Sequence, residues 1–218
     1  MAFIDPAEIE QLKAKITNDP SQLGKLYKSK KNDHYVKNVA HNLVEEMLAD
    51  GWEEFGTPLK TKTRLRKLKN HSVKFEDDIW CQLYELGYRC LNFSDDFRLP
   101  FGKNPLKKKQ IDVIAVNEDS ILLVECRSSE KLAKAPPLRD EFEALSARME
   151  GFRKTLEQLF GKGRRVKYIF ATRNMRLDNN HADIKRLKEV PGSFFYNDNT
   201  YNLLSAQKGF HFCLFFDL

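Results

Sequence analysis

The chain has 218 residues, of which 37 are basic and 31 acidic, and its formal net charge is +6. That length supports one sizeable core with a small additional domain, and the modest positive charge suits a polyanionic partner without identifying one. No apolar stretch approaches the ~18 residues of a membrane span, and the N-terminus lacks a basic segment followed by an apolar core, so neither membrane insertion nor secretion is expected.

Cysteine usage points to a reducing compartment. The four cysteines are Cys81, Cys90, Cys126 and Cys213. They have neither Cys-x-x-Cys nor zinc-ligand spacing, and three of them stand in apolar runs. Such residues are expected to be reduced, buried thiols. We therefore expect an intracellular, cytoplasmic protein.

Residues 1–56 read as an N-terminal helical extension. Asp5-Pro6 is a typical helix start. Further on, apolar residues recur at helical spacing up to Gly51, namely Val36, Val39, Leu43, Met47 and Leu48. This pattern predicts a long amphipathic helix that packs on the core or contacts DNA.

A strongly basic run follows, and we assign residues 57–72 to a basic linker or strand. Residues 57–69 contain no acid, and four cations alternate in a way that would place them on one face of a strand: Lys60, Lys62, Arg64 and Arg66. They would either bring positive charge to a phosphate backbone or form a solvated linker.

Residues 75–86 predict a helix that ends at Gly87, followed by a strand over 88–93. At about 100° per residue, its apolar side chains fall within one arc, and Glu76 falls inside that arc. A carboxylate on the buried side of a helix costs free energy unless it is paired or binds something. Glu76 is therefore either an acid near the helix start, favoured by the helix dipole, or an acid directed at a metal.

The most informative segment spans residues 110–127, which predict a β-hairpin with a turn at 117–120. If residues 116 and 121 are partners, partner numbers sum to 237, and Asp112 faces Glu125. Two carboxylates held that close need a proton or a cation between them, and Mg²⁺ or Mn²⁺ suits their hard oxygens. Side chains alternate, so Arg127 shares the face of Glu125, whereas Cys126 points to the opposite face.

Both strands of this hairpin are apolar on both sides, as expected for central strands covered on both faces. Acids at the ends of such strands are typical of a functional site rather than of a solvated face. Three consecutive lysines, Lys107, Lys108 and Lys109, stand just before Asp112 and would bring cations to a bound phosphate.

The remaining elements predict an α/β fold with a mixed central sheet. A long amphipathic helix over 138–159 precedes an apolar strand over 165–172, which is the crossover that a parallel strand pair needs. A short helix over 184–190, a strand near 194–196 and an apolar strand over 210–216 follow. That last strand either pairs into the sheet or belongs to a fragment whose missing partner domain covers it.

The pattern Ile111-Asp112, then Glu125-Cys126-Arg127 after an apolar strand, resembles the signature of the PD-(D/E)xK nuclease superfamily. It looks most like the Mrr-type and archaeal Holliday-junction-resolvase branches, in which a helix carrying a Glu precedes the hairpin. The resemblance covers roughly residues 73–172. Ile111 replaces the Pro of the family, and Arg127 replaces its Lys.

The resemblance implies a restriction-endonuclease-like core of order αβββαβ within residues 73–218. It assigns Asp112 and Glu125 as ligands of Mg²⁺ or Mn²⁺, the Cys126 carbonyl as a third ligand and Glu76 as a further or water-mediated one. Arg127 takes the catalytic position of the Lys. The implied function is a metal-dependent endonuclease acting on DNA in defence or repair. Related nucleases are often dimers because two strands must be cut, although no stretch here identifies an interface.

Arg127 leaves three explanations open. Arginine supplies charge and a fixed fork of donors but stays protonated, so it cannot be a general base. The site is then a working variant, or Lys109 or Lys131 takes over the role of the family's Lys, or the domain binds nucleic acid without cutting it. The alternative function is accordingly a weak or inactive nuclease-fold module for nucleic-acid binding or assembly.

Overall fold

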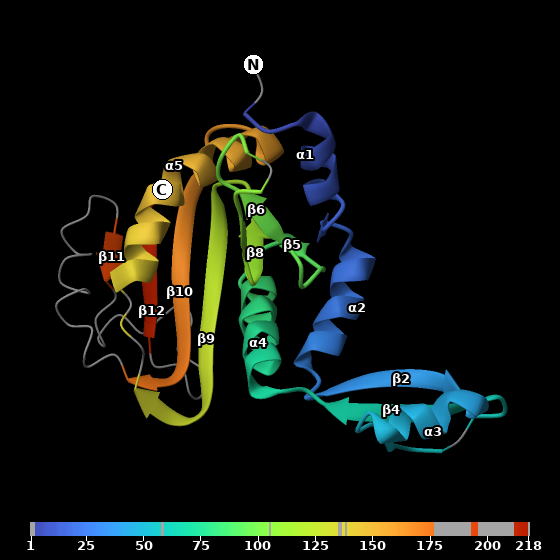
Figure 1. The fold of residues 1–218 in the computed structure, drawn as a ribbon. Helices are drawn as coiled ribbons and strands as arrows, with labels where there is room; N and C mark the ends of the chain where they lie inside the picture. Colours follow the sequence, from blue (N-terminus) through green and yellow to red (C-terminus); the bar gives the residue numbers. More distant parts are fainter. Residues whose placement is uncertain are drawn as a thin grey trace.

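A seven-stranded mixed sheet organises the chain (Figure 1). The computed structural model describes residues 3–57, 59–104, 106–134, 137, 139–176, 193–195 and 212–217. In spatial order the strands are β1 (Ile16–Thr17), β5 (Cys90–Asn92), β8 (Val113–Val116), β9 (Ser120–Lys134), β10 (Arg165–Arg176), β12 (Phe212–Asp217) and β11 (Ser193–Phe195). Only β9 and β10 pair in parallel, and the other neighbours in this sheet are antiparallel.

The β8–β9 hairpin has the predicted register. Its four partner pairs run from Val116–Ile121 to Val113–Val124, and each pair sums to 237. In the turn, Oδ1 of Asn117 accepts hydrogen bonds from the backbone N–H groups of Asp119 and Ser120, at 2.9 and 2.7 Å. An Asn side chain that satisfies its own turn in this way fixes the register from local sequence.

Helices cover both faces of the sheet. On one side, α4 (His71–Glu85) and α2 (Pro20–Lys31) pack together, and α4 buries Phe75 and Trp80 in a core shared with Val113 and Val124. On the other side, α5 (Arg139–Phe160) and α1 (Pro6–Lys13) share a second core. All four residues of β8 are buried, which confirms the prediction of a central strand covered on both faces.

Most of the elements predicted for the core are confirmed. The helices at 75–86 and 138–159 correspond to α4 and α5, and the strands at 88–93 and 165–172 correspond to β5 and β10. The helix α5 connects the parallel strands β9 and β10, as predicted. The terminal strand pairs into the sheet as β12, antiparallel to β10. The predicted helix over 184–190 lies outside the described residues.

The predicted helix that was to carry Val36 and Val39 is wrong over residues 34–40. These residues form β2 (His34–Ala40), which pairs along its whole length with β4 (Lys62–Leu68). With β3 (Glu53–Glu54) they make a three-stranded sheet of order β2-β4-β3 beside the large one (Figure 1). Seven long-range strand pairs outweigh the helical spacing of the apolar residues.

The N-terminal segment is not solely a helical extension. Within it, only η1 (His41–Leu43) and α3 (Val44–Ala49) are helical between 34 and 56, and α3 covers one face of the small sheet. Strand β1 belongs to the large sheet. The division of the chain at residues 56 and 72 stays a prediction, but the small sheet joins residues from both sides of position 56.

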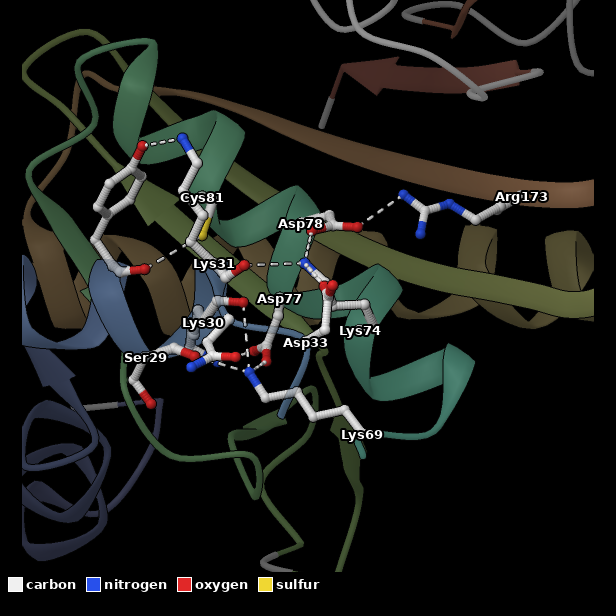
Figure 2. Close-up of polar contacts among 12 residues, drawn as sticks. Ser29, Lys30, Lys31, Asp33, Lys69, Lys74, Asp77, Asp78, Cys81 and Arg173 are labelled. Atoms are coloured by element: carbon white, nitrogen blue, oxygen red, sulfur yellow. Dashed lines mark hydrogen bonds and ion pairs between the residues drawn. The ribbon is translucent and has the colours of Figure 1, made fainter. Parts of the chain in front are cut away.

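A buried ion cluster ties the small sheet to the core (Figure 2). Just after β4, Nζ of Lys69 donates to Oδ2 of Asp77 on α4 at 2.8 Å and to the carbonyl of Ser29 on α2 at 2.8 Å. Lys30 Nζ contacts the other Asp77 oxygen at 2.5 Å. The side chains of Lys69 and Asp77 are only 3% and 7% exposed, so each depends on the other for its charge compensation.

Asp78, the next residue of α4, accepts hydrogen bonds from Lys74 and, at 3.0 Å, from Arg173 of β10 (Figure 2). Successive acids of one helix turn therefore fasten α4 to the small sheet and to the large one. None of the helices in the described part of the chain is both long and apolar enough to cross a membrane.

The buried cluster predicts a large loss of stability for Asp77→Asn. This change leaves Lys69 and Lys30 without their countercharge, and breaking a buried pair typically costs about 3 to 5 kcal/mol. Urea denaturation measures the loss. Asp33→Asn is the matched control, because the Asp33 side chain is 70% exposed at 3.4 Å from Lys74, and an exposed pair contributes less than about 1 kcal/mol. Equal losses in the two variants would contradict this view of the cluster.

Candidate functional site

The first site acid, Asp112, lies at a bend immediately before β8. The buried side chain of Asn92, at the end of β5, holds this bend: its Nδ2 donates to the Asp112 carbonyl and its Oδ1 accepts from Ile114 N–H, both at 3.0 Å. Trp80 Nε1 donates to the Asn92 carbonyl at 2.7 Å. The backbone around Asp112 is therefore fixed by α4 and β5 together.

Across the hairpin, Oδ2 of Asp112 accepts a hydrogen bond from the backbone N–H of Cys126 at 2.7 Å. The strand pairing itself ends one residue earlier, at Val113–Val124. Asp112 and Glu125 thus come close, as predicted. The Asp112 carboxylate, however, binds the backbone of β9, and the two residues are not partners in the strand pairing.

Glu125 is a buried acid in the middle of the large sheet, and it is surrounded by donors. Only 3% of the residue is exposed. Its Oε2 accepts from Lys109 Nζ at 2.7 Å and from the Tyr168 hydroxyl at 3.2 Å, and its Oε1 lies 2.8 Å from Arg127. Both carboxylate oxygens therefore have charged donors, which is what a buried carboxylate requires.

Arg127 bridges two acids. It shares the face of Glu125, as predicted, and its guanidinium also contacts Glu141 in the first turn of α5 at 2.9 Å. Burial lowers the pKa of Arg127, but the negative charges of Glu125 and Glu141 raise it by more than burial lowers it, so the net shift is upward. The side chain of Cys126 lies in the opposite core, on the α4 side, which confirms the predicted alternation.

Lys109 reaches the site from the hairpin of β6 (Arg98–Pro100) and β7 (Lys108–Gln110). This hairpin packs closely on α5. Thr155 Oγ1 donates to the Pro100 carbonyl at 2.9 Å, and a Cβ on Gly151 would lie 2.0 Å from the Phe101 carbonyl oxygen. Gly151 is thus needed for a backbone approach that no side chain permits. The hairpin delivers Lys109 to Glu125 from outside the large sheet.

The other lysines considered at this site lie elsewhere. Lys108 forms an ion pair with Glu8 of α1, and Lys107 is exposed. Lys131 is exposed further along β9. Of these, Lys109 is the one that contacts Glu125.

Glu76 lies on the second turn of α4, half-buried, and forms neither a hydrogen bond nor an ion pair within the described ranges. The helix begins at His71 with Asn70 as its cap, so its first turn does not include Glu76. An effect of the helix dipole, which falls off within the first turn, therefore does not explain the acid. Burial, together with the negative charges of Asp112 and Asp95, raises the pKa of Glu76 to about 7.

Asp112 is shifted in the same direction. Burial raises its pKa to about 6, against the lowering effect of the hydrogen bond from Cys126, and the charge of Glu125 raises it further. The site thus contains one acid that protein cations neutralise, Glu125, and two that lack sufficient positive charge, Asp112 and Glu76.

The donor chemistry of these two acids fits a divalent cation, which would supply the missing charge to hard carboxylate oxygens. As the side chains lie, no three Asp, Glu, His or Cys residues within the described ranges are arranged to hold a metal ion. The predicted ligand set of Asp112, Glu125, Glu76 and the Cys126 carbonyl remains a prediction.

The basic residues of the segment 57–69 do not join the acids. Lys62, Arg64 and Arg66 lie on β4, in the small sheet, whereas Asp112 and Glu125 belong to the β8–β9 hairpin of the large sheet. If Lys62, Arg64 and Arg66 bind nucleic acid as predicted, they would do so on a surface separate from the acids.

Three residues of the site were not predicted: Asn92, Glu141 and Tyr168. Tyr168 lies two residues before Phe170, the parallel partner of Glu125, so it could have been found only with the β9–β10 register in hand. Glu141 is one of two acids in the first turn of a helix, an ordinary pattern. Asn92 lies within the predicted strand 88–93 and is the last residue of β5, where a buried amide carries no distinctive signal.

Comparison with known proteins leaves the fold family open. The chain matches no protein-family model, and a search of the curated proteins finds no similar sequence.

The raised pKa values predict that Glu76→Gln stabilises the protein at alkaline pH. The folded state holds the Glu76 proton up to about pH 7, whereas the unfolded state releases it near 4.5. Stability associated with this group is therefore present at low pH and lost as pH rises between those values. Gln cannot ionise and so removes that loss. The unfolding free energy of the variant, relative to wild type, should therefore be higher at alkaline pH than at acid pH by on the order of 2 kcal/mol, after allowance for partial exposure.

Chemical denaturation on both sides of that pH window measures the difference. Glu45→Gln, on an exposed position of α3, is the control and should show no such pH-dependent gain. If the stability difference between Glu76→Gln and wild type were the same at every pH, the raised pKa of Glu76 would be contradicted.

Proposed function

We propose that this protein is a metal-dependent endonuclease that hydrolyses phosphodiester bonds in DNA. The observation that carries the proposal is the meeting of Asp112 and Glu125 beside two cations, Lys109 and Arg127, next to the acid-bearing helix α4. With the separate β6–β7 hairpin set aside, the elements of the large sheet and its helices follow the order α4, β5, β8, β9, α5, β10. This supports the proposal, because αβββαβ is the order expected from the resemblance to PD-(D/E)xK nucleases.

In this proposal Asp112 and Glu125 would hold Mg²⁺ or Mn²⁺, with Glu76 and the Cys126 carbonyl as further ligands. The bound ion would polarise the phosphodiester and lower the pKa of a bound water. Asn92 keeps the Asp112 backbone in place, and the hydrogen bond from the Cys126 backbone N–H fixes Oδ2 of the Asp112 carboxylate.

Lys109 supplies the amino group that the motif lacks at position 127. Its Nζ already lies 2.7 Å from Glu125, where it can orient a water and donate to a non-bridging phosphate oxygen. Arg127 adds fixed positive charge beside the same acid but cannot accept a proton. Of the three explanations for Arg127, the structure supports the one in which Lys109 takes over the missing role.

Metal and DNA should bind cooperatively. While Lys109 and Arg127 neutralise Glu125, they compete with a divalent cation for its oxygens. A DNA phosphate would offer Lys109 and Arg127 another partner, and their transfer to the phosphate would leave the Glu125 oxygens free to hold a divalent cation. DNA would therefore strengthen metal binding, and metal would strengthen DNA binding.

The neutralised state of Glu125 also favours a second candidate, a nucleic-acid-binding or assembly module that retains the fold without cutting. In that case Lys109 and Arg127 compensate Glu125 permanently, and a metal is unnecessary. Under either candidate the proposed partner is DNA and the proposed location is the cytoplasm. A homodimer follows only from the nuclease proposal.

The decisive experiment is cleavage of supercoiled and linear DNA in Mg²⁺, Mn²⁺ or EDTA. We expect metal-dependent cutting that falls at least about 100-fold in Asp112→Asn, Glu125→Gln and Lys109→Met, the size of loss typical when a group acting on the transition state is removed. Lys108→Met is the matched control, because Lys108 pairs with Glu8 instead, and it should cut like wild type. Arg127→Lys should cut at least as fast as wild type.

Cleavage that persists in Asp112→Asn would contradict the assignment of Asp112 to the active site. Absence of cutting by wild type in both metals, with salt-sensitive DNA binding retained, would select the binding module. Equal loss of activity in Lys109→Met and Lys108→Met would remove the assigned role of Lys109.

A further inference from the structure

The small sheet has one covered face and one open face. Helix α3 and Trp52 cover the face that carries Leu65, which is fully buried. Register places alternate residues of β2 and β4 on the other side, with Val36 opposite Arg66 and Asn38 opposite Arg64. We call this the open face; its residues on β2 and β4 are His34, Val36, Asn38, Ala40, Lys62, Arg64, Arg66 and Leu68. Val36 is 46% exposed, so the described elements leave this side uncovered.

Positive charge on the two faces is used differently. On the covered face, Lys67 pairs with Asp50 at 3.2 Å, and Lys37 lies over the Trp52 ring at 4.8 Å. On the open face, Arg66 pairs with Glu53 at 2.8 Å. Lys62 and Arg64 have no acidic partner in the part of the chain that the structure describes. The open face therefore presents uncompensated cations on a rigid strand.

We propose that the open face grips the phosphate backbone of double-stranded DNA. Alternate residues of an antiparallel strand are about 6.8 Å apart and lie on the same face of the sheet. Lys62, Arg64 and Arg66 thus form a row of cations along β4, and a surface that neutralises several phosphates of one duplex needs several cations side by side. Backbone contacts of this kind position a duplex without reading its sequence.

The aromatic residue next to this row favours a duplex over a single strand. The Phe55 ring lies 5.8 Å from the Arg64 guanidinium and 5.5 Å from that of Arg66, so both cations pack on it. Two guanidinium groups beside this ring leave less of it free to stack a base, and stacking platforms are what single-strand binders use. In the part of the chain that the structure describes, the open face therefore offers charge rather than a row of free aromatic rings.

This inference deepens the proposed function, on which its choice of DNA rests. The open face and the acids are mechanically connected. Strand β4 runs directly into Lys69, whose buried ion pair with Asp77 anchors the second turn of α4, the turn that also carries Glu76. A duplex held by the small sheet would therefore be held at a fixed offset from Asp112. The small sheet contributes affinity, and the acids contribute chemistry.

The test is DNA binding by the full chain in EDTA, where no cleavage can occur. Fluorescence anisotropy with a labelled duplex of about 20 base pairs gives the affinity between about 50 and 200 mM salt. The double variant Lys62→Gln/Arg64→Gln should bind about tenfold more weakly, and the slope of log K against log salt should fall by about 2. The control, Lys37→Gln/Lys67→Gln, removes the same charge from the covered face and should stay within about twofold of wild type.

Equal weakening in both double variants would overturn the proposal, because it would show only an effect of net charge. So would unchanged binding in the open-face variant, or tighter binding of a single strand than of the duplex. Asn38→Glu gives a second variant that places a negative charge on the open face at an exposed position, and circular dichroism checks that each variant is folded. Because EDTA is present throughout, failure of the nuclease proposal appears only in the cleavage assay.

Discussion

The burial of one carboxylate, Glu125, governs the arrangement around it. An ionised carboxylate in the middle of a sheet is tolerated only with charged or hydrogen-bonded partners. Three separate elements meet that requirement: β7 brings Lys109, β10 brings Tyr168, and Arg127 follows on β9 itself. The close packing of the β6–β7 hairpin on Gly151 of α5 positions Lys109 beside Glu125. Core packing and site electrostatics therefore depend on each other.

The same desolvation acts differently on the neighbouring acids. Asp112 has one backbone donor, and Glu76 has no partner within the described ranges, so burial raises both pKa values. A site with one neutralised acid and two that resist ionisation can take up a divalent cation or a proton, and either relieves the same cost. The proposed nuclease chemistry and the proposed coupling between DNA and metal both follow from this imbalance.

Local patterns predicted the parts of the fold that local physics determines. The turn at 117–120 and alternation along the hairpin fix its register, and with it the face shared by Glu125 and Arg127. Helical periodicity located α4 and α5. The strand β2 was missed because the spacing of Val36, Val39 and Leu43 also fits a helix, and only pairing with β4 decides between the two. The approach of Lys109 depends on how a hairpin docks on a distant helix, which no local pattern encodes.

In the proposed site, Asp112 and Glu76 are the two acids that lack positive charge, and we propose that a divalent cation shared with Glu125 supplies it. Carbon-13 NMR titration of their side-chain carboxyls, with and without Mg²⁺, tests it directly, with the Asp112→Asn and Glu76→Gln variants assigning the signals. Without metal the pKa values should lie near 7 for Glu76 and near 6 for Asp112. Saturating Mg²⁺ should move both below about 5. Values that Mg²⁺ and Mn²⁺ leave unchanged would contradict the claim.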